Sequence, residues 1–300
     1  MRLGRLLLLC AGLAAGCSGA EEPHGSPVLV GVYWIVGGRP MQVWSTSGAD
    51  AGAATPAAQE VDFVYDRLLD GNRIEDSVTQ NGTTIAVPKA TPPITVSWAD
   101  EATAMSAPPF SDRVLYNSEP IYGGTTAYVL LQPTQVGFPS SDTVTFALDK
   151  TGLTSAYGDQ MTGPAQISVP TGPFAASFRL PSGSDASATV AATFALPVLF
   201  TNRVGAASAV APFIRVRAGG APLPVTVAVD ASDATVVDVS PASCLGGWPT
   251  GVAIEVAVAA GLPDAFGAPM PAGATATFMA AGAAPPAPDG GCGPTDGGVD

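Results

Sequence analysis

The reactive side chains of this 300-residue chain are few: four cysteines and one histidine. His24 lies ahead of the first predicted strand, which excludes an ordinary Ser-His-Asp or Cys-His arrangement in a folded pocket. Paired carboxylates, which suffice for a glycosidase, stay conceivable because acids cluster between residues 62 and 76. Acids that flank a strand and its turn are usually solvated, so we expect no catalytic residue. The clustered acids are Asp62, Asp66, Asp70, Glu75 and Asp76.

Oxygen ligands for calcium are the best metal candidate that the sequence offers. Asp230, Asp233 and Asp238 lie close together on predicted loops between strands, which suits calcium. Their spacing does not match an EF-hand loop, and solvated turn acids are the competing interpretation. No phosphate-binding glycine loop is present, since the Gly-Gly pairs lack a following lysine or helix-forming stretch. We expect neither a metal nor a cofactor.

A mixed aromatic and polar stretch is the strongest candidate for ligand binding. Phe110, Tyr116 and Tyr122 fall within thirteen residues, and Tyr128 follows shortly after. A glycan or a peptide could stack on such rings. The alternative is that these rings cover the hydrophobic core.

The N-terminus has the layout of a secretory signal. A short positive segment (1–5) precedes an apolar run (6–15) that is too short to cross a bilayer as a mature helix, and Gly16-Cys17 closes it. The run Leu13-Ala-Ala-Gly-Cys17 resembles the lipobox of bacterial lipoproteins, although Leu13 stands one residue further from the cysteine than that family prefers. The resemblance implies that residues 1–16 are removed and that Cys17 is lipidated. A soluble secreted protein cleaved nearby is the alternative.

The same resemblance gives a location. Ser18 follows the cysteine, where the family's inner-membrane retention signal would be an aspartate, so an outer-membrane destination is expected in a diderm host. The membrane is then a partner through the lipid on Cys17, and residues 17–27 form a tether.

Composition indicates an acidic, folded ectodomain. Loss of Arg2 and Arg5 with the signal takes the formal net charge from −13 to −15. Nucleic acid is therefore not an expected partner, because phosphate binding relies on clustered Lys and Arg. Apolar residues reach 47% and charged ones only 12%, which differs from the composition of disordered chains. The mature length suits two domains.

Alternation of apolar and polar residues predicts an all-β fold. It recurs at 94–98, 143–148, 214–217, 225–229 and 252–258, each bounded by Pro, Gly, Asn or Asp. Such runs are typical of half-buried strands in a sandwich. Gly and Pro together exceed one residue in five, which disfavours long helices.

A ten-residue phrase occurs twice, at 152–161 and 261–270, with Gly, Leu, Ala, aromatic, Gly and Met at matched positions. We expect its glycines to serve positive-φ or closely packed turns, and its Leu, aromatic and Met side chains to plug the end of a sandwich. The order of strand, Gly-Leu turn and closing strand with Phe178 or Phe278 resembles bacterial Ig-like domains. That resemblance implies tandem sandwiches at 28–180 and 181–281.

Two segments fall outside this pattern. Residues 45–60 are rich in Ala, Gly, Ser and Thr and predict a flexible insert in the first domain. Residues 282–300 predict an extended tail. After processing, Cys244 and Cys292 remain, and we expect them to pair in an oxidising compartment. Two free thiols or an intermolecular bridge are the alternatives.

Together these features predict a non-enzymatic, lipid-anchored envelope protein that serves as a spacer, an adhesive or a scaffold, with a possible protein or glycan ligand. One alternative is a carbohydrate-active or accessory enzyme subunit that uses the acids of the first domain. Another is a partner-binding subunit of an envelope complex.

Overall fold

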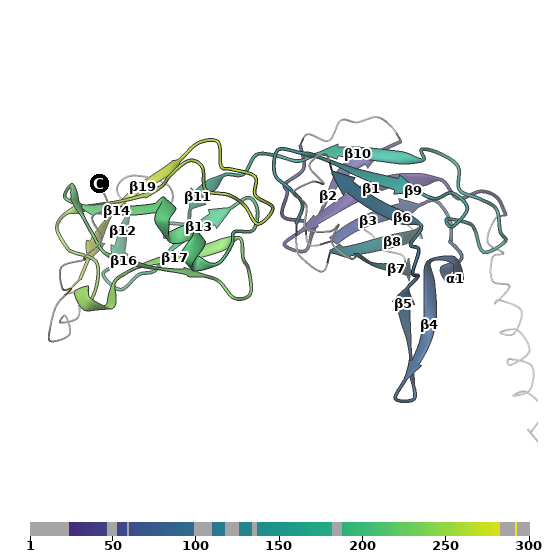
Figure 1. Ribbon diagram of the computed structural model, residues 1–300, viewed down its shortest axis with the longest axis horizontal. Coiled ribbons are helices and arrows are strands. Elements are labelled where there is room, and N and C mark those ends of the chain that lie inside the picture. The colour runs from purple at the N-terminus through teal and green to yellow at the C-terminus, as the bar shows by residue number, and fades with distance from the viewer. Residues whose placement is uncertain are drawn as a thin grey trace, which may run out of the picture.

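The computed structural model describes residues 24–46, 53–58, 60–98, 110–117, 126–133, 137–181, 188–282 and Cys292. Strands dominate the described residues, which confirms the predicted all-β class. Figure 1 shows two bodies of strands joined end to end. Within the described ranges no helix is long and apolar enough to cross a membrane. The predicted signal, Cys17 and the tether up to residue 23 lie outside those ranges.

The first body is a sandwich of a five-stranded and a three-stranded sheet. The larger sheet has the strand order β2-β1-β3-β8-β7, and the smaller one has the order β10-β9-β6. Neighbouring strands in both sheets are antiparallel. The bounds are β1 Leu29–Val36, β2 Arg39–Ser45, β3 Glu60–Tyr65, β6 Ile94–Trp98, β7 Phe110–Asn117, β8 Thr126–Pro133, β9 Thr143–Leu148 and β10 Gln166–Pro170.

Alternation along these strands builds the first core. Ile94 and Phe146 are buried, while Thr95 and Ala147, which follow them, are exposed, as the period-two pattern predicts. Aromatic rings fill the space between the sheets: Trp34 lies 4.7 Å from Phe138, and Phe63 lies 5.2 Å from Phe146, between ring centroids. These offset and edge contacts are the favoured geometry for aromatic pairs.

The second body is also a sandwich, with sheets ordered β11-β13-β17-β16 and β12-β19-β18-β14-β15. β12 runs parallel to β19, and the other neighbouring strands in these two sheets are antiparallel. The strands are β11 Ala176–Phe178, β12 Thr189–Ala191, β13 Leu196–Phe200, β14 Ile214–Ala218, β15 Ala221–Pro222, β16 Val225–Val229, β17 Val236–Pro241, β18 Ala253–Val258 and β19 Ala274–Ala281. Its helical turns are short: α2 Ala207–Val210, η2 Ala211–Phe213 and η3 Ser243–Leu245.

A separate core fills the second sandwich. Trp248 and Phe278 meet edge to face at 5.4 Å, and the Trp248 Nε1–H donates to the carbonyl of Phe194 at 2.6 Å. Phe174 stacks on Phe200 at 5.4 Å. The indole thus contributes apolar area without burying an unpaired donor.

The chain passes from one core to the other over residues 171–175. Phe174 is already buried in the second core, and β11 pairs with β13 of the second sandwich. Residues 176–178 therefore belong to the second body, although the predicted boundary lay at 180/181. Phe178 does not close the first sandwich, because β10 pairs with β9 there, as β19 pairs with β18 in the second.

The Ala-rich insert is partly built into the first sandwich. Between β2 and β3 the structure describes residues 53–58, in which Ala54 and Ala58 are fully buried. The Ala54 amide donates to Pro170 O, and the Gly172 amide donates to Ala54 O, each at 2.8 Å. Small side chains allow this close backbone approach, so residues 53–58 pack against the chain between the bodies. The prediction of a flexible loop at 45–60 is wrong for these residues.

A hairpin projects from the first sandwich (Figure 1). Asp70 caps the short helix α1, Gly71–Ile74, and β4, Glu75–Gln80, and β5, Thr83–Pro88, then form a separate two-stranded sheet. Asn81 (φ 52°) and Gly82 (φ 79°) make its tight turn, in the left-handed conformation that two-residue hairpins favour. We call residues 75–88 the arm.

Candidate functional site

The two copies of the repeated phrase fold into the same turn. The Met161 amide donates to Leu153 O, and the Met270 amide donates to Leu262 O, both at 2.8 Å. The leucines and methionines are buried, as predicted. Gly158 has φ +88° and Gly267 has φ +92°. The phrase therefore needs glycine at this position, because other residues rarely adopt such angles.

The aromatic residue of the phrase does not plug the sandwich, contrary to the prediction. Tyr157 is 48% exposed. Phe266 is half-buried, and it meets Trp98 of the first sandwich edge to face at 6.1 Å. This ring position points out of its own sandwich, where it can contact a neighbour.

A side-chain oxygen stabilises each turn from inside the phrase. In the first copy the Ser155 Oγ accepts from the amides of Tyr157 and Asp159, each at 3.2 Å. In the second copy the Asp264 Oδ1 accepts from the amides of Phe266 and Ala268, each at 2.9 Å. Serine and aspartate thus accept the same pair of amide hydrogen bonds in the turn. Aspartate also has a second carboxylate oxygen, which the turn does not use.

That second oxygen joins the two sandwiches. The Asp264 Oδ2 accepts from the Ser140 amide at 3.1 Å and from the Asn202 Nδ2 at 2.9 Å. The same Nδ2 lies 2.8 Å from Phe138 O and 3.1 Å from Ser140 Oγ. Phe138 and Ser140 belong to the first sandwich, and Asn202 and Asp264 belong to the second. We call these four residues the junction cluster.

The junction cluster is buried as deeply as a protein core. Asn202 is 0% exposed, Ser140 is 3% exposed and Asp264 is 5% exposed. A buried carboxylate and carboxamide are costly unless their hydrogen bonds are made, and here each has partners on both sides of the contact. If the sandwiches separated, water would have to replace these hydrogen-bond partners. The cluster therefore specifies one relative position of the two bodies.

Backbone packing reinforces this contact. Gly137 has φ +104°, and a Cβ at this position would lie 2.8 Å from the Asn202 Oδ1 and 3.2 Å from Pro56 O. Pro56 O accepts the Phe138 amide at 2.8 Å, and the Thr171 hydroxyl donates to Pro139 O at 2.6 Å. The insert, the loop before β9 and the segment between the bodies are therefore bonded to one another.

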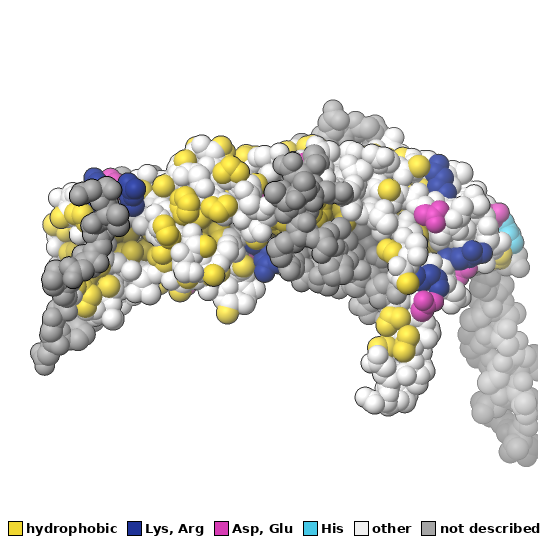
Figure 2. Space-filling model, in the orientation of Figure 1, with side chains coloured by type: hydrophobic (Ala, Val, Ile, Leu, Met, Phe, Trp, Pro, Cys, Tyr) yellow, Lys and Arg dark blue, Asp and Glu magenta, His cyan; other side chains and the backbone are white. Residues whose placement is uncertain are grey.

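The end of the first sandwich away from the junction is covered by the chain's own N-terminal segment, where the only histidine lies (Figure 2). The His24 ring lies 3.9 Å from the Tyr157 ring, and the Arg67 Nη1 donates to His24 O at 3.0 Å. The Val28 amide donates to Asp66 Oδ1, as the Ala175 amide donates to Thr201 Oγ1 in the second sandwich. His24 therefore packs on Tyr157 of the first repeated phrase. The described residues around it form no Ser-His-Asp or Cys-His arrangement.

The clustered acids of the first domain have separate local contacts. Asp66 pairs with Arg67, Asp70 caps α1, and Asp76 pairs with Lys89 at the base of the arm. Asp62 is buried within β3. Glu75 begins β4, where it lies opposite Pro88. These contacts stabilise local structure, and no observation on them favours glycoside hydrolysis.

The structure describes three of the four residues of the predicted aromatic surface. Phe110 and Tyr116 lie in β7 and Tyr128 lies in β8, where Tyr116 is opposite Ala127 and Tyr128 is opposite Leu115. Tyr122 falls outside the described residues. Three of these residues thus share two adjacent strands, and ligand binding there stays a prediction.

The suggested calcium ligands are engaged in turns. The Asp230 Oδ1 accepts from the Ser232 hydroxyl and amide, each at 2.7 Å, and the hydroxyl is the main cause that lowers the pKa of Asp230. The Asp233 Oδ1 accepts from the Thr235 hydroxyl and amide. Asp238 lies in β17 opposite Ala228. The described residues include no group of three or more side chains arranged to hold a metal ion.

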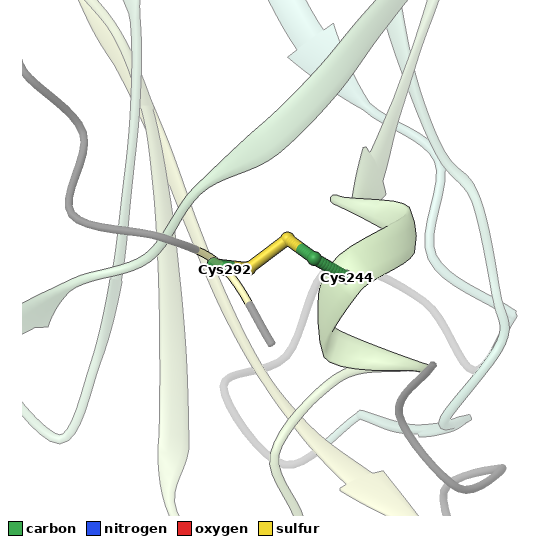
Figure 3. The surroundings of a disulfide bond; sticks show 2 residues. All are labelled: Cys244 and Cys292. Atoms are coloured by element: carbon green, nitrogen blue, oxygen red, sulfur yellow. A yellow bond between two sulfur atoms is a disulfide. The ribbon is translucent and has the colours of Figure 1, made fainter. Parts of the chain in front are cut away.

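Cys244 and Cys292 are joined in the structure (Figure 3). Cys244 lies in η3, and its Cα is 5.0 Å from that of Cys292. The described bond ties a residue from the C-terminal segment to the end of the second sandwich. The rest of the predicted tail, beyond Gly282, lies outside the described residues.

The fold and the junction cluster define an all-β protein of two sandwiches with a built contact between them. No protein-family model matches the chain, and no curated protein is significantly similar to it. Asn202 and Ser140 were not singled out from the sequence. One signal was present: Gly137-Phe-Pro-Ser140 reappears as Gly247-Trp-Pro-Thr250, which marks the loop before β9 as part of the repeat.

Proposed function

We propose that this chain is a non-enzymatic, lipid-anchored protein of the bacterial cell envelope, in which two Ig-like sandwiches form a stiff spacer or scaffold. The lipobox-like run ending at Cys17 and the cysteine pair support export to an oxidising compartment. The acidic composition supports a protein that does not bind nucleic acid.

The junction cluster is the observation that carries this proposal. Domains joined by a linker ordinarily move relative to each other unless their contact is large or well bonded. Here the buried carboxylate of Asp264 accepts from the Ser140 amide of the first sandwich, and the carboxamide of Asn202 donates to Phe138 O and lies within hydrogen-bond distance of Ser140 Oγ. Such a contact has no use in a chain whose domains act independently. It suits a protein that must hold a fixed distance or present a surface at a fixed angle.

The experiment that tests the proposal follows the anchor in native cells. Membranes from cells that produce the full chain are digested, and the N-terminal peptide is identified by mass spectrometry. An acylated Cys17 at the new N-terminus is the expected result, and Cys17→Ser should move the protein from the membrane to the soluble fraction. An unmodified N-terminus elsewhere, with equal membrane attachment of Cys17→Ser, would contradict the anchor.

Protease treatment of intact cells then distinguishes an adhesive at the outer surface from a periplasmic scaffold. Release of peptides from both sandwiches would place the protein on the outer surface and favour adhesion. Protection in intact cells, with cleavage after outer-membrane permeabilisation, would favour a periplasmic scaffold.

A further inference from the structure

The arm is the feature of the fold that the spacer does not explain. Its strands β4 and β5 form a sheet of their own, and neither outer edge pairs with another described strand. A lone two-stranded hairpin is only marginally stable in water. Val78 and Ile85 lie opposite each other and are each 38% exposed. The arm thus presents strand edges that belong to no larger sheet, and apolar side chains outside both cores, although β5 lies close to β7 of the first sandwich.

Charge is absent from most of the arm in a strongly acidic protein. Residues 77–88 contain no charged side chain, whereas the whole chain has a formal net charge of −13. Figure 2 shows charged side chains near the base of the arm and none on its outer part in this view. Exposed edges are usually protected by charge, especially lysine, and here that protection is missing between Asp76 and Lys89. Two acidic molecules could therefore meet at their arms without direct repulsion.

The register of the hairpin determines which backbone groups of β5 face outward. Gln80 and Thr83 flank the two-residue turn and form a hydrogen-bonded pair, so the pairs alternate from there along the arm. The Lys89 amide donates to Ile74 O at 3.3 Å, which agrees with this alternation. Ile85 therefore bonds inward to Val78. Thr84 and Ala86 direct their amides and carbonyls outward, and Pro88 ends this edge because it has no amide proton.

We propose that the outer edge of β5 pairs with β5 of a second copy of this chain, antiparallel and centred on Ile85. In this register Thr84 of each copy lies opposite Ala86 of the other, and both exchange hydrogen bonds. Ile85 then lies opposite its own counterpart as a non-hydrogen-bonded pair, about 4.5 Å apart between Cα atoms. Val78, both copies of Ile85 and the second Val78 form an apolar stripe across four strands. Such cross-strand pairs are what stabilises a sheet.

β5 is favoured over β4 as the strand that pairs with the second copy, because β5 contains no acidic residue. β4 begins with Glu75 and Asp76, while Thr83-Thr-Ile-Ala-Val87 is rich in residues that favour strands. The contact is small against the roughly 1,000 Å² that a stable interface needs, so it is expected to be weak in dilute solution. Anchoring of both copies in one membrane would raise their effective concentration. The affinity of the β5 pairing therefore rests on the proposed anchor, but its register does not.

Single added cysteines test the register. Ile85→Cys is placed in the full chain with Cys244 and Cys292 retained, and membranes from producing cells are treated with a mild oxidant. The matched control is Thr83→Cys, on the same strand and also exposed. In the proposed register Thr83 lies roughly 13 Å from its counterpart, too far for a disulfide. We expect Ile85→Cys to form covalent dimers at least about tenfold more efficiently than Thr83→Cys.

A second variant tests the backbone pairing. Ala86→Pro removes the outward amide of residue 86 but no bond within the hairpin, since proline is tolerated on the open side of an edge strand. Added to Ile85→Cys, it should reduce cross-linking about tenfold, while circular dichroism and the melting temperature stay unchanged. Equal cross-linking of Thr83→Cys, persistence with Ala86→Pro, or dimers of Val78→Cys in place of Ile85→Cys would each overturn the pairing.

The same cysteines distinguish this inference from the proposed anchor. Soluble protein, obtained if Cys17 is not lipidated, is oxidised at high concentration. Dimers specific to Ile85→Cys there would support the pairing even though the anchor fails. Acylated protein in membranes without such dimers would support the anchor and refute the pairing.

Discussion

Asp264→Ser separates the two tasks of the junction aspartate. Serine at this position can still accept from the amides of Phe266 and Ala268, because Ser155 does so at the matching position of the first copy. It lacks the second oxygen, which accepts from the Ser140 amide across the contact and from the Asn202 Nδ2 within the second sandwich. The substitution therefore keeps the turn and removes the bond that Asp264 makes to the first sandwich, while the bonds from Asn202 to Phe138 and Ser140 remain.

The size of the effect follows from the bonds that are lost. Hydrogen bonds to a charged group contribute ~1.5–3 kcal/mol each, and the buried Ser140 amide would be left without its acceptor. Asn202 keeps Phe138 O and Ser140 Oγ as partners, which limits its loss. We estimate that the docked arrangement is weakened by about 3 kcal/mol, which is roughly a hundredfold in the ratio of docked to undocked molecules.

Calorimetry and small-angle X-ray scattering of the mature protein measure this effect. The melting temperature of the second sandwich should fall by roughly 10 °C, and the scattering should change from that of one fixed shape to that of a mixture. Ser155→Ala is the control, since it weakens the first turn but leaves the junction cluster intact. Wild-type melting and scattering in Asp264→Ser would refute the conclusion that these bonds hold the sandwiches together.

Other substitutions test separate contacts. Gly137→Ala should loosen the junction, because its Cβ would approach the Asn202 Oδ1 to 2.8 Å and its φ is +104°; scattering of the variant checks this. Cys244→Ser should lower the unfolding free energy by up to about 4 kcal/mol in the chain-entropy model, given the separation of 48 residues, and an unchanged denaturation midpoint would contradict an intact disulfide. The Thr151 hydroxyl, followed by its amide, lowers the pKa of Asp149, so this carboxylate stabilises the fold above its unfolded pKa of about 3.8, and the contribution is lost as the pH falls through the folded pKa. Asp149→Asn should therefore lose less stability than the wild type between about pH 5 and pH 2 in urea titrations; equal losses would count against this contribution.

Local patterns in the sequence predict the strands and the turns of the repeat. β6, β9, β14, β16 and β18 lie where alternation predicts them, since one face of each packs against a core. The second glycine of each copy of the phrase, Gly158 and Gly267, has the positive φ that this turn position requires. These features depend on neighbours in the chain, so the sequence shows them directly.

Contacts between residues far apart in the sequence could not be predicted from such local patterns. Asp264 and Ser140 are 124 residues apart, and nothing near Asp264 indicates that its second oxygen reaches another domain. The burial of residues 53–58 was missed because Ala and Gly suit both flexible loops and close backbone packing. Tyr157 and Phe266 were expected inside because they are aromatic, whereas their place on the turn directs them outward.

The most direct test of a fixed two-sandwich spacer is the measurement of residual dipolar couplings on the mature chain in a weakly aligning medium. Amides of the two sandwiches should fit one common alignment tensor, and Asp264→Ser should split this into two tensors of different magnitude. Two independent tensors in the wild-type protein would contradict the account, because the sandwiches would then reorient separately despite the junction cluster.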